Sequence, residues 1–347
     1  MNRDELYMSM AINLARKAEG LTSPNPMVGA VIVKNNRIVG KGYHRMCGLA
    51  HAEVEAISDA GRRAKGATMY VTLEPCDHFG RTPPCTQTII ENGIRKVVIA
   101  MKDPNPINSG RGTRRLKGNG IKIKSGVLEN KARNINKPYI KFITTGFPYV
   151  TVKIAESIDG KIATRTGDSK WITSLAARSY VHDLRAKSDA VMVGVNTVIK
   201  DDPSLLSKTS KHNQPVRIIV DSHGRTPKNA KIFSTAERSP VIIATVKGKR
   251  GCEVSGRVDL RCLLKELAGM GIINILVEGG GELVGSLVEE KLVDRFLFFI
   301  APKIIGGRSA VTSVEGCGIA KIKDAMELKG LKIKKFGKDL LIDAEVS

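Results

Sequence analysis

Short apolar runs rich in β-branched residues recur along this chain, and they constrain its fold more than any other feature. In the first half, such runs cover residues 27–33, 37–44, 67–75, 94–101 and 121–128. The segments between them, at 5–18, 51–61 and 85–93, space their apolar residues as helices do. Strands that alternate with helices are typical of a sheet with helices on its faces. The pattern therefore predicts an α/β fold.

The same alternation begins again after residues 137–150. The later apolar runs cover 151–163, 189–199, 216–222, 240–246, 273–288 and 294–305. With 347 residues, the chain is long enough for two domains of ordinary size. We therefore expect one domain over 1–147 and a second over 148–347.

The charge of the chain is strongly positive, with a formal net charge of +22 at pH 7. Such a charge suits a nucleic acid, an anionic membrane surface or small ligands that carry phosphate. The basic runs at 62–65, 111–118 and 332–339 contain few of the aromatic residues that stack on bases. We therefore expect a phosphorylated small-molecule substrate, and neither nucleic acid nor membrane as a partner.

The chain has six cysteines, and the compartment in which it works determines whether they are expected to form disulfides. The first twenty residues lack the apolar segment of a signal peptide, and we expect a cytoplasmic protein, in which structural disulfides are rare. Cys76 and Cys85 flank a loop rich in Pro, Gly and polar residues, which favours a metal site or catalysis. The other four cysteines lack such spacing and are expected to be ordinary thiols: Cys47, Cys252, Cys262 and Cys317.

His51 and Glu53 stand at the expected start of the helix over 51–61. Zinc-dependent deamination needs an imidazole, two thiolates, an open fourth position for water, and a carboxylate that is not a ligand. His51, Cys76 and Cys85 would bind the zinc, which would yield hydroxide at neutral pH. Glu53 would move a proton from that water to the departing amine.

Other interpretations stay open on these residues alone. The site could hold a purely structural zinc, with Cys47 or His78 as a fourth ligand, or the cysteines could bind no metal. The charge would also suit a base deaminase that acts on nucleic acid. A non-catalytic metal-binding protein is a further alternative, although it gives Glu53 no purpose.

The glycine-rich run at 279–288, GGGELVGSLV, follows an apolar strand and opens a helix. Glycines there would let backbone N–H groups approach a phosphate. Glu282 and Val284 stand where the pattern G-x-G-x-x-G needs glycine, so a Rossmann fingerprint is not supported. A phosphate-binding turn and a turn without a ligand both stay open.

The motifs TSPNPMVGAVIV, GYH, HAE, TLEPCDHFGRTPPC and DPNP together resemble the bifunctional deaminase/reductase of riboflavin biosynthesis. In the second half, SIDGKIA, WIT, DAVMVGVNTV, DDP, VEGGGELVGSLV and APKIIGG extend the resemblance over nearly the whole chain. The long loop between the cysteines distinguishes it from cytidine and tRNA adenosine deaminases. The resemblance implies a cytidine-deaminase-like domain followed by a dihydrofolate-reductase-like domain.

Two consecutive reactions are implied by this resemblance. The first is zinc-dependent deamination of 2,5-diamino-6-ribosylamino-4(3H)-pyrimidinone 5′-phosphate. The second is reduction of the ribosyl group by NADPH, which gives 5-amino-6-ribitylamino-uracil 5′-phosphate. We expect one zinc ion per chain, NADPH as the second cofactor, and a homo-oligomer.

The resemblance also assigns residues, with His51, Cys76 and Cys85 as zinc ligands and Glu53 as the proton shuttle. It assigns NADPH to Ala155, Trp171, Thr197, Asp201, Ser222, Gly280, Gly281, Glu282, Leu283, Val284, Gly285 and Ser286. It assigns substrate to Asn25, His44, Lys153, Ser169, Arg185, Leu205, Lys208 and Glu278. Of these, Arg185 suits the substrate phosphate, because its planar fork can bind two oxygens.

Five positions depart from the usual pattern of this family. Lys208 stands where arginine is usual, which keeps the charge and loses the bidentate fork. Asn196 replaces a usual glycine, Asp77 and Phe79 stand where serine and histidine are frequent, and Ala30 stands where cysteine is common. None of the five is a zinc ligand or the proton shuttle.

Overall fold

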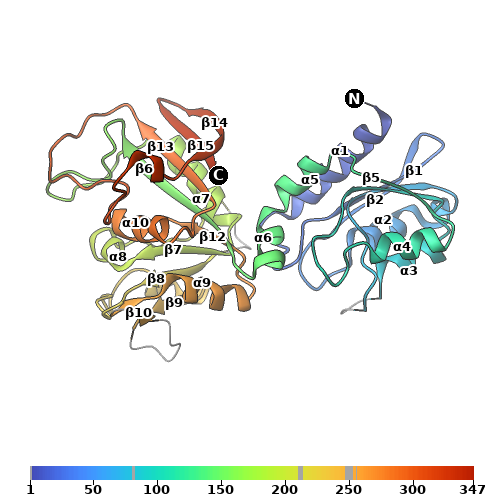
Figure 1. The fold of residues 1–347 in the computed structure, drawn as a ribbon, viewed down its shortest axis with the longest axis horizontal. Helices are drawn as coiled ribbons and strands as arrows, with labels where there is room; N and C mark the ends of the chain where they lie inside the picture. Colours follow the sequence, from blue (N-terminus) through green and yellow to red (C-terminus); the bar gives the residue numbers. More distant parts are fainter. Residues whose placement is uncertain (1, 80–82, 210–213, 247–252, 255) are drawn as a thin grey trace. The chain divides into compact units, whose positions relative to one another are not determined.

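The computed structural model describes residues 2–79, 83–209, 214–246, 253–254 and 256–347 (Figure 1). The chain forms two compact units, Met1–Gly146 and Phe147–Ser347. Each unit has its own sheet and its own apolar core.

The N-terminal unit is built on a five-stranded sheet with the order β2-β1-β3-β4-β5. Its strands are β1 (Gly29–Lys34), β2 (Arg37–Tyr43), β3 (Thr68–Leu73), β4 (Lys96–Met101) and β5 (Lys122–Ser125). β1 pairs antiparallel with β2 and β3, whereas the β3–β4 and β4–β5 pairs are parallel. Asn35 and Asn36 both have positive φ, as the tight two-residue turn between β1 and β2 requires.

Helices cover both faces of this sheet. Figure 1 shows α1 (Arg3–Ala15) and α5 (Glu129–Ile135) on one face, and α2 (Ala52–Ala60), α3 (Cys85–Glu91) and α4 (Arg111–Gly118) on the other. Short 3₁₀ turns follow α1 and α2, at η1 (Arg16–Ala18) and η2 (Gly61–Ala64), and α6 (Lys137–Thr145) comes last. A Cβ at Gly29 would overlap the α1 backbone at Ala11, so this helix lies very close to β1.

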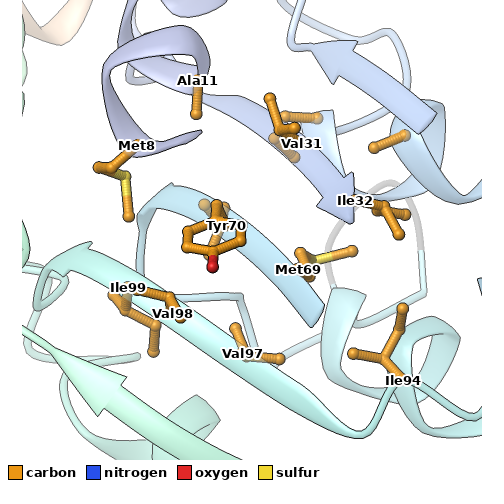
Figure 2. Packing of buried hydrophobic residues seen from close by; sticks show 14 of the residues in the cluster. Met8, Ala11, Val31, Ile32, Met69, Tyr70, Ile94, Val97, Val98 and Ile99 are labelled. Carbon is orange, nitrogen blue, oxygen red and sulfur yellow. The ribbon is translucent and has the colours of Figure 1, made fainter. Parts of the chain in front are cut away.

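The core of this unit is mostly aliphatic and includes Tyr70. Figure 2 shows Met8 and Ala11 of α1 together with Val31, Tyr70 and Val98 from three neighbouring strands. Val31 pairs with Tyr70, and Tyr70 with Val98, so the three side chains lie on one face of the sheet.

The C-terminal unit contains an eight-stranded sheet with the order β14-β15-β13-β6-β12-β7-β8-β9. Its strands are β6 (Tyr149–Ser157), β7 (Ala190–Gly194), β8 (Val216–Val220), β9 (Val241–Ala244), β12 (Asn274–Val277), β13 (Arg295–Ala301), β14 (Leu328–Phe336) and β15 (Asp339–Val346). From β13 to β9 neighbouring strands are parallel, while β15 pairs antiparallel with β13 and β14. A separate two-stranded ribbon pairs β10 (Glu253–Val254) with β11 (Arg257–Val258).

Two helices pack on each face of the eight-stranded sheet. Buried leucines of α9 (Leu260–Gly269) and α10 (Gly281–Glu289) pack on Met192 of β7, and α8 (Val195–Asp201) packs on Val191 and Val193 from the opposite face. α7 (Leu175–Ala186) packs on Phe299 of β13. Two 3₁₀ turns lie outside these layers, at η3 (Phe233–Arg238) and η4 (Ile322–Asp324).

Of the four cysteines that were expected to be ordinary thiols, the structure corrects one. Cys47 and Cys317 are free, as expected. Cys262 is disulfide-bonded, so the expectation that it is an ordinary thiol is wrong. Cys252 lies outside the described residues. Within the described ranges, none of the helices combines the length and hydropathy that a membrane crossing requires.

Candidate active sites

Three side chains of the N-terminal unit converge as candidate metal ligands: His51, Cys76 and Cys85. Their ligand atoms all lie within 4.8 Å of one another. His51 Nδ1 is 3.2 Å from Cys85 Sγ and 3.6 Å from Cys76 Sγ. Nitrogen and sulfur ligands about 2.0–2.3 Å from a tetrahedral zinc lie roughly 3.5 Å apart. The donor set and its spacing therefore fit one zinc ion with an open fourth position.

Each candidate ligand comes from a different element. His51 is the N-cap of α2 and has extended backbone, which turns its side chain toward the cysteines at the irregular start of the helix. Cys76 lies in the loop after β3, and Cys85 is the first residue of α3. The backbone N–H of Cys85 donates to Cys76 Sγ at 3.4 Å, which ties the two segments together.

The two thiols differ in their ionisation. A hydrogen bond from Cys85 and another from His51 lower the pKa of Cys76 to about 4 against the effect of burial. The same interaction with Cys76, together with burial, raises the pKa of Cys85. The Cys76 hydrogen bond also raises the pKa of His51. Without a metal ion, Cys76 is therefore the more acidic thiol of the pair.

Glu53 lies in the first turn of α2 and is only 4% exposed. Burial, and to a lesser extent the negative charge of Cys76, raises its pKa to about 7. A carboxyl group with a pKa near neutral can both accept and return a proton at physiological pH. Glu53 is outside the ligand cluster and lines the cavity beside it.

A cavity of about 450 Å³ opens beside this cluster and brings Asn25 and His44 to it. His44 Nδ1 lies 3.1 Å from the carbonyl oxygen of Ala50, so this nitrogen carries the proton. His44 Nε2 then accepts from Asn25 Nδ2 at 3.3 Å. Burial lowers the pKa of His44, which keeps the ring neutral.

Sequence reasoning did not single out several residues that line the same cavity. Asp103 and Asn105 belong to the DPNP motif, and Tyr139 lies on α6, within the segment taken as the domain boundary. Tyr139 donates its hydroxyl to Asp103 Oδ1 at 3.0 Å. The DPNP motif was the signal for the first two; no local pattern identifies Tyr139.

The C-terminal unit contains a cavity of about 1720 Å³ where β7, β8 and β12 end. Parallel sheets of this type commonly bind ligands at the carboxyl ends of their strands. All but two of the residues expected to contact NADPH or the substrate of reduction line it: Lys153, Ala155, Ser169, Trp171, Arg185, Thr197, Asp201, Leu205, Lys208, Ser222, Glu278, Gly280, Gly281, Glu282, Leu283 and Ser286. Val284 and Gly285 are buried on α10 and do not line it.

Arg185 meets Glu278 in this cavity through both arms of its fork. Arg185 Nε and Nη2 donate to the two Glu278 carboxylate oxygens at 2.6 and 3.0 Å, and Nη1 donates to the Leu206 carbonyl at 3.2 Å. The fork therefore holds Glu278, and the assignment of Arg185 to the substrate phosphate stays a prediction. Lys153 Nζ lies 3.6 Å from Glu278 Oε2.

Burial and the neighbouring cations shift the pKa of Glu278 in opposite directions. Burial opposes ionisation of Glu278, but the Arg185 and Lys153 cations outweigh it and lower its pKa to about 2. Burial also lowers the pKa of Lys153. Glu278 is therefore a carboxylate held in one orientation at the cavity wall.

Three further side chains of the wall have partners that hold them in place. Trp171 is exposed to the cavity, and the Arg178 guanidinium carbon lies 4.3 Å from its ring centroid, a cation–π geometry. Ser169 donates to Asp201 Oδ1 at 3.1 Å. Asn196, one of the departures from the family pattern, donates to Glu282 Oε2 at 3.1 Å.

Some glycines of the 279–288 run allow close packing of the backbone, and Gly280 leaves open space at the cavity. A Cβ at Gly285 would overlap the backbone at Glu315, and one at Gly281 would come within 2.6 Å of the Thr312 carbonyl oxygen. These two glycines therefore let residues 312–316 pack against α10. Among the described residues, a Cβ added at Gly280 would meet only Thr197 Oγ1 within 4 Å, at 3.9 Å, so Gly280 has open space beside it at the cavity.

Known proteins resemble both units and the chain as a whole. Residues 1–101 match the family model of the cytidine and deoxycytidylate deaminase zinc-binding region, and residues 148–342 match that of the RibD C-terminal domain. The riboflavin biosynthesis protein RibD of Aquifex aeolicus is 46% identical over 350 residues, covering 98% of this chain and 97% of its own. The chain belongs to the RibD family.

Other RibD proteins are similar over the same length. The Escherichia coli protein is 40% identical, with 98% of both chains covered. The structure of RibD from Acinetobacter baumannii superposes with a TM-score of 0.90 at 38% identity, covering 99% of each chain. A deaminase/reductase structure from Thermotoga maritima gives 0.89 at 35% identity, again over 99% of each chain.

Membership of the RibD family confirms the expected fold class, a cytidine-deaminase-like domain followed by a reductase domain. It also confirms the expected activity: the chain is a bifunctional enzyme of riboflavin biosynthesis, with a deaminase and a reductase activity. The deaminase part is of the zinc-binding kind.

Proposed function

We propose that His51, Cys76 and Cys85 hold one zinc ion per chain and that the adjoining cavity deaminates 2,5-diamino-6-ribosylamino-4(3H)-pyrimidinone 5′-phosphate. The observation that carries this proposal is the placement of a buried Glu53 beside the three converging ligands. A structural zinc site needs no such carboxylate and is normally closed by a fourth ligand. Bound zinc supplies Lewis-acid activation of the attacking water.

Glu53 moves the protons of this reaction. Its carboxylate accepts a proton from the attacking water and returns it to the departing amine, which leaves as ammonia. A pKa of about 7 suits both transfers, because neither form of Glu53 is strongly favoured at neutral pH.

Asn25 and His44 bind and orient the pyrimidine ring in this proposal. His44 is neutral with its Nδ1–H committed to the Ala50 carbonyl, so its Nε2 accepts from Asn25 and orients the Asn25 amide. The Asn25 amide, which now donates to that nitrogen, can turn its other polar atoms to the substrate.

The larger cavity takes NADPH and the deaminated intermediate in this proposal. NADPH brings the hydride, so the protein must align it with the sugar carbon and exclude water. Glu278, fixed by Arg185 and Lys153, accepts hydrogen bonds from the sugar hydroxyls. Because the Arg185 fork is occupied, Lys208 at the exposed rim is the better cation for the substrate phosphate. A cytoplasmic location and a homo-oligomer stay predictions.

Mass spectrometry of the products tests both halves in order. The purified protein is given the diaminopyrimidine ribotide without NADPH, and then with it. Oxygen should replace NH in the first case, and two hydrogens should be added in the second. Addition of hydrogen without prior exchange would contradict the proposed order of reactions.

A further inference from the structure

The residues that directly follow the two candidate cysteine ligands are bonded to each other. Thr86 donates its hydroxyl to Asp77 Oδ1 at 2.7 Å. The backbone N–H of Thr86 also donates to the Cys76 carbonyl at 3.2 Å. Thr86 is fully buried, so its hydroxyl has no access to water. Two hydrogen bonds therefore fix the segment of Cys76 against the segment of Cys85.

Asp77 also joins this pair of segments to α4. Arg115 Nη1 donates to the same Asp77 oxygen at 2.8 Å, as a charge-assisted bond. The backbone N–H of Asp77 donates to Asn108 Oδ1 at 2.8 Å. A Cβ at Gly112 would overlap the Pro75 carbonyl, so α4 lies directly against the backbone that precedes Cys76. One carboxylate thus ties together the Cys76 loop, α3 and α4.

We propose that Asp77 is a positioning residue for the metal site: its bonds to Thr86 and Arg115 fix the separation of the two thiolates and so slow the loss of zinc. The inference rests on the proposed function of the N-terminal site. Groups that hold metal ligands in place typically change metal affinity by about 10–100-fold when they are removed. A preset separation favours the metal because the ligands need no reordering to bind it.

The chain offers a matched control carboxylate in the same unit. Asp4 accepts from Tyr70 Oη at 2.8 Å and from Lys124 Nζ at 2.6 Å, and its side chain is 18% exposed against 17% for Asp77. Both carboxylates therefore have one hydroxyl donor and one cation. Only Asp77 is next to a candidate ligand.

The experiment measures zinc release from the zinc-loaded full-length protein into an excess of a chromogenic chelator. Asp77→Ala should release zinc about 10–100-fold faster than wild type. Thr86→Val should change the rate in the same direction by less, and Asp77→Asn, which keeps an acceptor oxygen, should lie between Asp77→Ala and wild type. Asp4→Ala should release zinc at the wild-type rate. The unfolding temperatures of the zinc-free Asp77→Ala and Asp4→Ala proteins should be similar.

Release from Asp77→Ala and Thr86→Val at the wild-type rate would overturn the inference and leave the zinc site itself intact. Equal acceleration by Asp4→Ala would also overturn it, because the effect would then follow general stability. Failure of the wild type to retain zinc, or equal retention by Cys85→Ser, would instead overturn the proposed site and the inference with it.

Discussion

Arg185 and Glu278 form a two-pronged ion pair inside the reductase cavity, with nitrogen–oxygen distances of 2.6 and 3.0 Å. Their side chains are only 14% and 8% exposed. They are 93 residues apart in the sequence, on α7 and directly after β12. The pair therefore determines the orientation of a carboxylate at the cavity wall, and removing one partner would leave a buried charge poorly paired.

Removal of Arg185 should strongly destabilise the C-terminal unit. In Arg185→Met, Glu278 keeps only the more distant Lys153, and breaking a buried ion pair typically costs about 3–5 kcal/mol. Denaturant unfolding measures the change in the free energy of unfolding. The double variant Arg185→Met/Glu278→Gln should recover part of it, since no unpaired charge stays buried. A double variant less stable than the single one would contradict this account.

The free energy of unfolding should depend on pH through the ionisation of Glu278. Its pKa in the folded protein, about 2, is below the ordinary 4.5. A lowered carboxyl pKa stabilises the folded state fully above the unfolded pKa, and this contribution is lost as pH falls through the folded pKa. The difference in unfolding free energy between wild type and Glu278→Gln should thus be constant above pH 4.5 and shrink toward pH 2. A difference that grows on acidification would contradict the assignment.

Two glycines of the N-terminal unit should respond oppositely to alanine. In Gly29→Ala the added Cβ overlaps the backbone of α1, and overpacking of this kind costs about 1–3 kcal/mol. Gly118, at the end of α4, has no atom within 4 Å of such a Cβ, and alanine there should be neutral or stabilise by up to about 1 kcal/mol. Thermal unfolding of both variants measures this contrast. Equal destabilisation would show that α1 does not lie so close to β1.

Gly285→Ala should impair the reductase and leave the deaminase unchanged. The added Cβ would displace the backbone at Glu315, which lies against α10 beside the cavity. Gly269→Ala, on α9 with nothing within 4 Å, is the matched control in the same unit. Both activities are measured separately, with predeaminated substrate for the reductase. Full reductase activity in Gly285→Ala would mean that residues 312–316 have no part in shaping the cavity.

The chemistry of the first site could be predicted from the sequence, because a zinc deaminase needs particular residue types in a fixed order. His51 and Glu53 point to the same place only at a helix start, and α2 does begin there. The Arg185–Glu278 pair could not be predicted, since nothing local indicates a partner 93 residues away. Arginine forks bind carboxylates and phosphates alike, so residue type alone does not indicate that Arg185 meets Glu278.

The alternation of strands and helices was predicted for many buried elements, but not for all of them: α9, with its buried leucines, and β15 fall outside the predicted runs. Exposed elements were missed as well. α4 buries only Gly112 and Leu116, so it shows no apolar stripe and was noted only as a basic run. α6 was not predicted as a helix for the same reason, since only Tyr139 is buried on it. β14 is exposed along most of its length, and exposed strands lack the alternation that identifies half-buried ones.

The central claim is that Glu53 moves protons beside a zinc ion that it does not bind. The most direct measurement compares wild type with Glu53→Gln for zinc content and for deamination without NADPH. The account predicts unchanged zinc content and a loss of deamination of at least about 10²-fold, because proton transfer is removed while the ligands stay. Deamination by Glu53→Gln at the wild-type rate, with zinc bound, would contradict it.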